Sequence, residues 1–264
     1  MKDIHKKTIV TLLLSLFLGF AYAQDNNVVM IEKIRGDQIT IDHLGNLYII
    51  QNALLQKYNE NGQFLFSYSN FSFGNITSVD VSNPMKIMVF YQETGTIMFL
   101  DDRLAPVSNK IDLYNFQYMT VSLAAYSSDN KIWLYDEVHA DIIALDIYFK
   151  EIHRVHYNFQ EFNPTQFQEI SSKMFFMHNP EQGVFLFDFF GTYIKTIPVQ
   201  SSFPVQFYNN SIYYLKNNQL HIYNYARLSE ETWEMEMSHI KQCLVGKNRL
   251  YLLDKTGRVT IQSL

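Results

Sequence analysis

The feature that most restricts the fold of this chain is an internal repeat of about forty residues. In six places a turn-rich stretch precedes a short apolar run, and the copies align on Asn46, Lys86, Lys131, Lys173, Ser211 and Arg249. Successive copies are 40, 45, 42, 38 and 38 residues apart. A fixed period of this size is typical of proteins built from repeated supersecondary units. The repeat therefore decides the fold class before any single motif is considered.

Each repeat contains several short strands. A second apolar run follows each copy and ends in a polar turn, where equivalent places are taken by Asn59, Asp101, Asp146, Asp188 and Asn224. Asn and Asp suit such places because their side chains bond to nearby backbone amides. A third run precedes each copy. The runs are short, rich in Ile, Val, Tyr and Phe, and bounded by turn residues, which indicates strands.

Six repeats of three to four strands, without helical periodicity between them, predict an all-β, six-bladed β-propeller with four-stranded blades. The last copy supplies three strands, whereas the stretch VVMIEKI (28–34) belongs to no copy. We expect that stretch to be the outer strand of the last blade and to close the ring. The tetrapeptide YNFQ, found at 114–117 and 157–160, then marks two equivalent connections between blades.

The first copy, IDHLGNLYIIQNALLQKYNENGQFL (41–65), resembles the NHL-type repeat of six-bladed propellers. An acidic residue and a glycine precede an apolar strand, and a second strand ends in Asn-x-x-Gly. The resemblance implies the propeller fold but no single function, because such propellers include enzymes, sensors and scaffolds. An outer-membrane β-barrel is the alternative, but its strands need about 9 to 11 alternating residues. The runs here are shorter.

The N-terminal residues resemble a secretory signal. A basic start precedes an apolar run from Ile9 to Phe20 and the small-x-small triplet Ala21-Tyr22-Ala23. We expect cleavage before Gln24, so that residues 1–23 are removed and residues 24–264 form one domain. The apolar run is shorter than the roughly 20 residues of a membrane span. The mature chain is therefore expected to be soluble, not membrane-spanning, and located in the periplasm or outside the cell.

Charge and cysteine content exclude some classes of binding partner and site. The formal net charge is −5, and the mature chain has no cluster of Lys and Arg, which disfavours nucleic acid and anionic membranes. The single cysteine, Cys243, excludes an internal disulfide and a CxxC site, and its apolar setting predicts a buried thiol.

The candidate binding face follows from the propeller topology. Connections between blades share a face with the loops that join second and third strands, and that face usually binds ligands. The predicted face carries the aromatic residues Phe71, Phe73, Tyr114, Phe116, Tyr157, Phe159 and Phe203. Tyr and Phe on fixed loops suit protein interfaces. The alternative is that these rings pack between adjacent blades.

The loop YDEVHAD (135–141) is the densest group of ionisable residues in the chain. Asp136, Glu137, His139 and Asp141 lie in it, and His178 and Glu181 lie in a neighbouring loop. These residue types bind hard cations or zinc. Their spacing matches no specific metal motif, however, so we favour a solvated acidic loop and predict neither a metal nor another cofactor.

The inner strands predict a largely neutral channel. The residues assigned to it are Thr40, Ser78, Ser122, Gln166, Gln206 and Gln242, with Asp80 as the one possible charge. The sequence contains no nucleophile elbow, phosphate loop or HExxH motif, and no catalytic residue is predicted. We therefore favour an exported, non-catalytic propeller that binds a protein partner, in envelope or secretion machinery and peripheral to an outer-membrane complex. The alternative, from the resemblance, is a metal-dependent hydrolase or lyase of the lactonase type.

Overall fold

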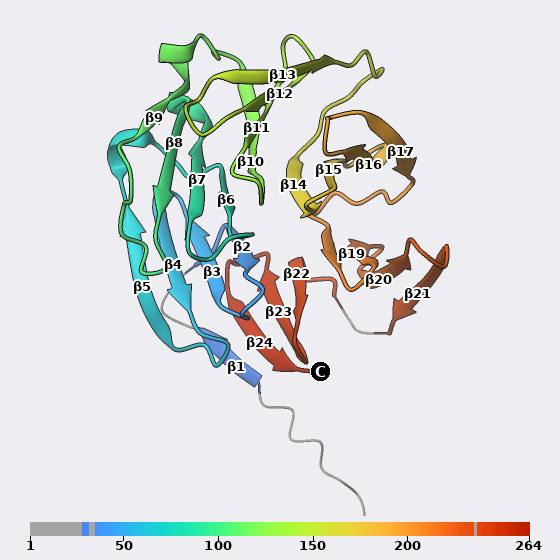
Figure 1. The fold of residues 1–264 in the computed structure, drawn as a ribbon. Coiled ribbons are helices and arrows are strands. Elements are labelled where there is room, and N and C mark those ends of the chain that lie inside the picture. Colours follow the sequence, from blue (N-terminus) through green and yellow to red (C-terminus); the bar gives the residue numbers. More distant parts are fainter. Residues whose placement is uncertain (1–27, 32–34, 235–236) are drawn as a thin grey trace, which may run out of the picture.

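The protein is a ring of six four-stranded antiparallel sheets, as predicted (Figure 1). The computed structural model describes residues 28–31, 35–234 and 237–264. Blade 1 contains β2 (Gln38–Ile41), β3 (Leu47–Gln51), β4 (Leu54–Tyr58) and β5 (Phe64–Ser69). Blade 2 contains β6 (Ser78–Asp80), β7 (Ile87–Tyr91), β8 (Thr96–Leu100) and β9 (Ile111–Asp112). Blade 3 contains β10 (Val121–Tyr126), β11 (Ile132–Asp136), β12 (Asp141–Leu145) and β13 (Glu151–His156).

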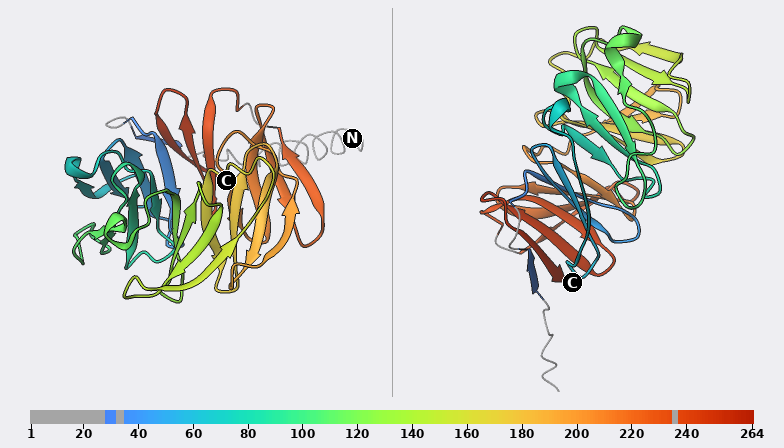
Figure 2. Two further views of the ribbon diagram at one scale, coloured as in Figure 1. Left: turned by 90° about the horizontal axis from the view of Figure 1, so that it is seen from above. Right: turned by 90° about the vertical axis from the view of Figure 1, so that its left-hand side faces the viewer.

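The second half of the ring has the same organisation (Figure 2). Blade 4 contains β14 (Gln166–Ser171), β15 (Met174–Asn179), β16 (Gly183–Asp188) and β17 (Tyr193–Ile197). Blade 5 contains β18 (Gln206–Tyr208), β19 (Ser211–Lys216), β20 (Gln219–Asn224) and β21 (Ser229–Trp233). Blade 6 contains β22 (Ile240–Gly246), β23 (Arg249–Asp254), β24 (Val259–Ser263) and β1 (Val28–Ile31). Three 3₁₀ helices, η1 (Phe71–Phe73), η2 (Gln92–Thr94) and η3 (Leu113–Phe116), lie in loops.

The N-terminal strand closes the ring, which confirms the prediction. β1 is the outer strand of blade 6 and pairs antiparallel with β24, with Val28 opposite Gln262 and Ile31 opposite Val259. Residues 32–34 of the predicted strand lie outside the described residues, as does the whole predicted signal sequence with its cleavage point at Gln24. Within the described ranges, no helix has the length and apolar character to cross a membrane.

The outer turns are built as the sequence predicted. In each of four turns one Asp or Asn side-chain oxygen accepts hydrogen bonds from the backbone amides two and four residues later; the four are Asn59, Asp101, Asp146 and Asp188. Asn224 bonds in a similar way to the amides two and three residues later. The fourth turn position has a positive φ, and Gly62 and Gly191 occupy it without strain. Leu104 and Phe149 take the same conformation in their blades.

The core lies between the blades. Six separate clusters of buried side chains each combine residues of two neighbouring sheets. Tyr48 of blade 1 and Tyr91 of blade 2, for example, belong to one cluster and are fully buried. Cys243 is buried in the cluster between blades 5 and 6, as predicted, and burial raises the pKa of its thiol to about 12. Each blade is therefore stabilised mainly by its two neighbours.

Candidate partner-binding face and central channel

The connections between blades and the loops joining second and third strands lie together, as the topology predicted. Thr94 of η2 donates a hydrogen bond to the carbonyl of Phe73 (3.0 Å), in the connection from blade 1 to blade 2. In the next blade, Tyr157 N donates to the carbonyl of Ala140 (3.0 Å). In blade 4, the Gln182 side chain donates to the carbonyl of Gln160 (2.6 Å).

Three of the seven predicted aromatic residues are exposed. Phe71 is 82% exposed, Tyr114 39% and Phe116 40%. Short 3₁₀ helices hold them in place: the Asn70 side chain accepts from Ser72 N at the start of η1, and the Asp112 side chain accepts from Tyr114 N at the start of η3. Phe116 also packs on Phe149 of blade 3, with ring centroids 5.8 Å apart.

The other four aromatic residues pack between blades, which is the alternative role that the sequence left open. Phe73 meets Tyr91 edge to face, with centroids 5.3 Å apart. Tyr157 and Phe159 stack on each other at 5.0 Å and lie against the cluster between blades 3 and 4. Phe203 packs against the cluster between blades 5 and 6.

Phe159 is the centre of an aromatic group. Its ring contacts five others, with centroids between 5.0 and 6.5 Å away, which belong to Tyr157, Phe162, Phe185, Phe187 and Tyr193. The hydroxyl of Tyr157 donates to the carbonyl of Gly191 and accepts from Tyr193 N (2.9 Å). These contacts fix the connection between blades 3 and 4 rather than presenting it to a partner.

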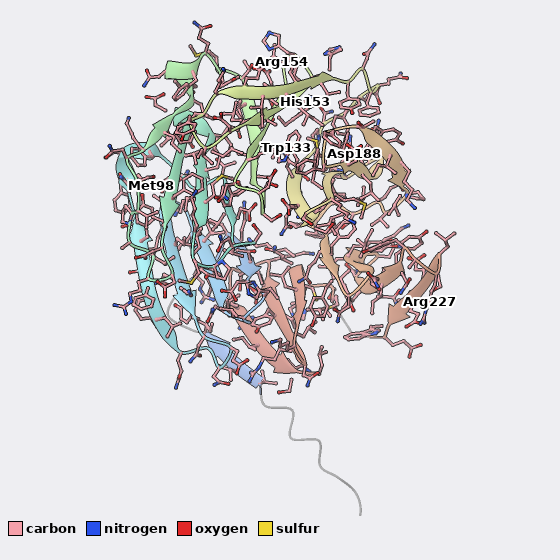
Figure 3. All side chains as sticks on the ribbon, viewed as in Figure 1. Met98, Trp133, His153, Arg154, Asp188 and Arg227 are labelled. Carbon is pink, nitrogen blue, oxygen red and sulfur yellow. The ribbon has the colours of Figure 1, made fainter. Side chains whose placement is uncertain are left out.

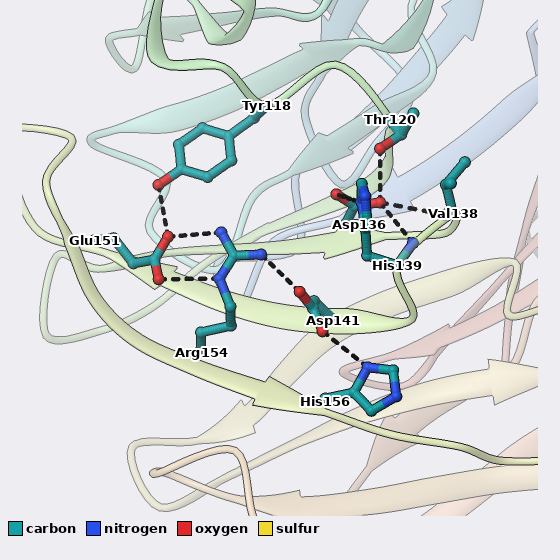
Figure 4. Close-up of polar contacts among 9 residues, drawn as sticks. All are labelled: Tyr118, Thr120, Asp136, Val138, His139, Asp141, Glu151, Arg154 and His156. Carbon is teal, nitrogen blue, oxygen red and sulfur yellow. Dashed lines mark hydrogen bonds and ion pairs between the residues drawn. The ribbon is translucent and has the colours of Figure 1, made fainter.

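The two aspartates of the YDEVHAD loop are buried, and each belongs to a different hydrogen-bond network (Figure 4). Asp136 ends β11, and its carboxylate accepts from the Thr120 hydroxyl (2.6 Å), from the backbone of Val138 and His139, and from His139 Nδ1 (2.8 Å). Burial raises the pKa of this carboxyl, but the hydrogen bonds from Thr120 and His139 outweigh it and lower the pKa overall.

Asp141 belongs to a second network. It begins β12, and its carboxylate accepts from Arg154 Nη1 (2.6 Å) and bonds to His156 Nδ1 (3.1 Å). Arg154, on the outer strand β13 (Figure 3), also makes two hydrogen bonds to Glu151 at 2.7 and 3.0 Å, and Tyr118 donates to Glu151 (3.0 Å). Arg154 lowers the pKa of Glu151. The network ties the connection between blades 2 and 3 to the edge of blade 3.

The remaining four predicted residues are dispersed. Glu137 and Glu181 are exposed, and the His139 side chain is 65% exposed. His178 is not in a loop but within β15, where it is fully buried and neither ring nitrogen has a hydrogen-bond partner. Burial lowers the pKa of its imidazole to about 4. Across the described ranges, no three His, Cys, Asp or Glu side chains lie close enough together to hold a metal ion.

The central channel is a cavity of about 660 Å³, and glutamines in its wall join the blades. Gln242 accepts from Ile39 N (2.9 Å) and donates to Ile39 O (2.8 Å) of the next inner strand. Gln166 makes the same pair of bonds to Val205, and Gln206 makes it to Val245. The three glutamines that the sequence assigned to the channel therefore line it, and their amides join neighbouring blades.

The channel is more charged than the sequence predicted. Thr40, Ser78 and Asp80 line it as expected, whereas Ser122 is not among its lining residues. Further ionisable side chains line it, namely Asp37, Asp42, His43, Glu169, Lys241 and Lys247. Sequence reasoning missed Glu169 because a single register position separates channel and interblade faces.

Two of these carboxylates hold blade 3. Asp80 of blade 2 is buried and accepts from Tyr126 N (2.9 Å), and Glu169 of blade 4 accepts from Ser128 N (2.9 Å). Burial, with a smaller contribution from Glu169, raises the pKa of Asp80. At these two blade junctions a carboxylate makes the side-chain hydrogen bond to the neighbouring blade. At three other junctions a glutamine does so.

Solved structures of other proteins share this fold. The chain is similar to BamB from Moraxella catarrhalis (TM-score 0.58, 12% identity, 90% of this chain and 100% of that chain). It is also similar to virginiamycin B lyase from Staphylococcus aureus (TM-score 0.57, 10% identity, 86% and 79%) and to the WD40 domain of Neurospora crassa Pan2 (TM-score 0.58, 8% identity, 87% and 89%). At these identities the likeness shows the propeller fold alone, and it agrees with the NHL-type resemblance.

No protein-family model matches the chain, and no curated protein matches it in sequence. Its structural neighbours include a WD40 domain and a lyase, so the fold by itself does not select a function.

Proposed function

We propose that this protein is an exported, non-catalytic propeller that binds a partner protein through the face formed by its blade connections. The observation that carries the proposal is the exposure of Phe71, Tyr114 and Phe116 on short, hydrogen-bonded helices of that face. Large apolar side chains on a rigid support lose little entropy on binding and are frequent energetic centres of interfaces.

The packing of the connection aromatics supports a smaller binding surface than the whole face predicted from the sequence. Around blades 4 to 6, the connection aromatics Tyr157, Phe159 and Phe203 are used for packing between blades. Around blades 1 to 3, Phe71 and Phe116 remain accessible. A partner that uses aromatic contacts would therefore bind at the junctions of blades 1, 2 and 3.

Export belongs to the same proposal. It is supported by the basic start, the apolar run and the Ala21-Tyr22-Ala23 triplet, with the mature chain beginning at Gln24. The proposed setting is the cell envelope or secretion machinery, at the periphery of an outer-membrane complex. Intact-mass measurement of the exported protein tests this part: a species that begins at Gln24 supports it, and a membrane-held species that keeps Met1 contradicts it.

A site-specific photo-crosslinking experiment tests the binding face. A photoreactive phenylalanine analogue is placed at position 71 or 116 of the full chain in its native cell, and at position 190 as a control. Phe190 is 64% exposed, but it lies on the turn between β16 and β17, at the end of β16 remote from the 180–182 loop. We expect a discrete adduct from positions 71 and 116 and none from position 190.

Substitution of the same positions completes the test. In proteins without the photoreactive analogue, Phe71→Ser and Phe116→Ser should each reduce co-purification of the partner that crosslinking identified at least tenfold. The reason is that a central interface aromatic contributes roughly 2 kcal/mol or more. Phe190→Ser should leave recovery unchanged. Equal crosslinking from all three positions, or recovery that is insensitive to Phe71→Ser and Phe116→Ser, would contradict the proposed face.

A further inference from the structure

The exposed aromatic residues belong to a continuous set of loops, here called the aromatic sector, which comprises residues 70–77, 92–95, 113–120, 137–140, 157–165 and 180–182. Hydrogen bonds join each loop to the next. Tyr114 of the third loop donates to the carbonyl of Glu93 in the second (3.4 Å). Glu137 N donates to the carbonyl of Thr120 (3.1 Å), which joins the fourth loop to the third.

The same sector is acidic. None of its six loops contains a Lys or Arg. The second, fourth, fifth and sixth loops each contain one exposed glutamate, namely Glu93, Glu137, Glu161 and Glu181. Cations near its border are already paired. Lys110 lies 3.8 Å from Asp112 and over the Phe73 ring, and Arg154 is bonded to Glu151 and Asp141. The sector therefore combines exposed apolar groups with anionic groups and has no Lys or Arg in its loops.

The turns at the opposite ends of the strands have a different charge pattern. They contain seven lysine and arginine residues, one in each of seven turns: Lys86, Arg103, Lys131, Lys150, Lys173, Arg227 and Lys247. These turns also contain acids, among them Asp101, Asp129 and Asp146, so they carry both signs of charge. The loops of the sector carry glutamates without Lys or Arg, next to the loops that expose Phe71 and Phe116.

We infer that the aromatic sector binds a segment of a partner protein that combines apolar side chains with several lysines or arginines. The inference rests on the proposed function and specifies the chemistry of the partner. Apolar anchors would pack on Phe71, Tyr114 and Phe116, while cations would lie near the four glutamates. Complementary charge at the edge of an interface speeds association and excludes acidic segments more than it tightens the complex. The interaction is consequently sensitive to salt.

Designed peptides provide the direct test. Three labelled peptides of equal length are used: one alternates Leu-rich and Lys-rich positions, one has Glu in place of each Lys, and one has Ser in place of each Leu. Binding to the mature protein is measured by fluorescence anisotropy in 50 and 300 mM salt. We expect the Leu/Lys peptide to bind at least tenfold more tightly than either relative and to weaken at least fivefold in the higher salt.

Charge variants identify the surface. A protein with Glu93→Gln, Glu137→Gln, Glu161→Gln and Glu181→Gln should bind the Leu/Lys peptide at least tenfold more weakly. A control variant with Glu60→Gln, Glu231→Gln and Glu234→Gln, which removes three exposed acids outside the sector, should bind it as the parent does. Circular dichroism confirms that both variants are folded. Equal weakening by the two sets, or equal binding of the Leu/Lys and Leu/Glu peptides, would overturn the inference.

Failure of the inference and failure of the proposed function give different results. A native partner whose recovery depends on Phe71 and Phe116 but not on salt or the four glutamates would keep the binding face and refute the basic segment. Peptide binding that ignores Phe71→Ser and Phe116→Ser, together with no adduct from positions 71 and 116, would refute both.

Discussion

A single buried histidine shows how strongly position controls the chemistry of a side chain in this fold. His178 lies on the same side of β15 as Phe176, which belongs to the cluster between blades 4 and 5, and neither of its nitrogens is hydrogen-bonded. Burial disfavours the charged imidazolium, which is why the pKa falls to about 4 from 6.5. The sequence placed this residue beside possible metal ligands, whereas the strand directs it into the space between blades.

The lowered pKa of His178 predicts an acid-sensitive fold. Between pH 6.5 and 4 the unfolded chain binds a proton that the folded protein does not, so the free energy of unfolding falls as pH falls through this window. At about 1.4 kcal/mol per pKa unit, the loss is on the order of 3 kcal/mol. His178→Leu should flatten the dependence, as measured by denaturant unfolding at several pH values. Comparison at pH 7.5 isolates its packing effect, and parallel profiles for both proteins would contradict the assignment.

We predict that the same substitution has different effects on stability at Phe71 and at Phe159. Phe159→Ser removes a ring that contacts five others and should destabilise the protein by about 3 kcal/mol. Phe71→Ser changes a side chain that is 82% exposed and should alter stability by no more than about 0.5 kcal/mol. Thermal and urea unfolding measure both. A fully tolerated Phe159→Ser would mean that this ring is available to a partner after all.

The sequence predicted the positions of these aromatic residues but not their exposure. All seven occur in the expected connections, because a strand count and a turn pattern suffice to place a loop. Exposure depends on side-chain direction across a blade junction, which no periodicity encodes. Within η1, Phe71 is exposed, whereas Phe73, two residues later, packs on Tyr91.

At the scale of elements, the inner strands are joined by side-chain amides rather than by backbone pairing. Gln166, Gln206 and Gln242 each satisfy one N–H and one C=O of the neighbouring inner strand. Glutamine can do this because its amide carries both a donor and an acceptor. A carboxylate such as that of Asp80 supplies only acceptors when ionised, and it holds blade 3 by a single bond to Tyr126 N.

Loss of one of these amides should therefore be costly. Gln242→Leu leaves the N–H and C=O of Ile39 without their partners in a buried setting, and we expect a loss of roughly 2 to 4 kcal/mol. Gln168→Leu is the matched control, because Gln168 lines the same channel and its side chain makes no hydrogen bond to the described residues. Equal unfolding free energies for the two variants would show that the amide bonds contribute little.

The strands themselves were the most predictable part of the fold. The repeats aligned on Asn46 and its equivalents correspond to β3, β7, β11, β15, β19 and β23, and the turn at Asp146 forms as expected. The channel was less predictable. Glu169 and Gln168 are adjacent on β14, and only the twist and register of the strand decide how each faces the cavity and the neighbouring blade.

For the whole molecule, the closing strand predicts cooperative loss of stability. A variant lacking residues 28–31 loses the side chain of Ile31, which is 5% exposed in the cluster between blades 6 and 1, and leaves the outer edge of β24 unpaired. We expect the entire ring to unfold at a lower temperature, with a loss of at least about 3 kcal/mol. Val28→Lys serves as a control, because Val28 is 53% exposed. An unchanged melting temperature for the deletion would contradict the closure.

The pairing of β1 with β24 also means that the ring cannot close until the last strand has been synthesised. Ile31 and Val259 are partners in the sheet but lie 228 residues apart in the chain. At synthesis rates of about 5 to 20 residues per second, β1 waits roughly 10 to 45 seconds for β24 to be made. During that time its apolar residues have no sheet to join. A chaperone that holds extended apolar segments would therefore act longest on the first strand and be released only when the ring closes.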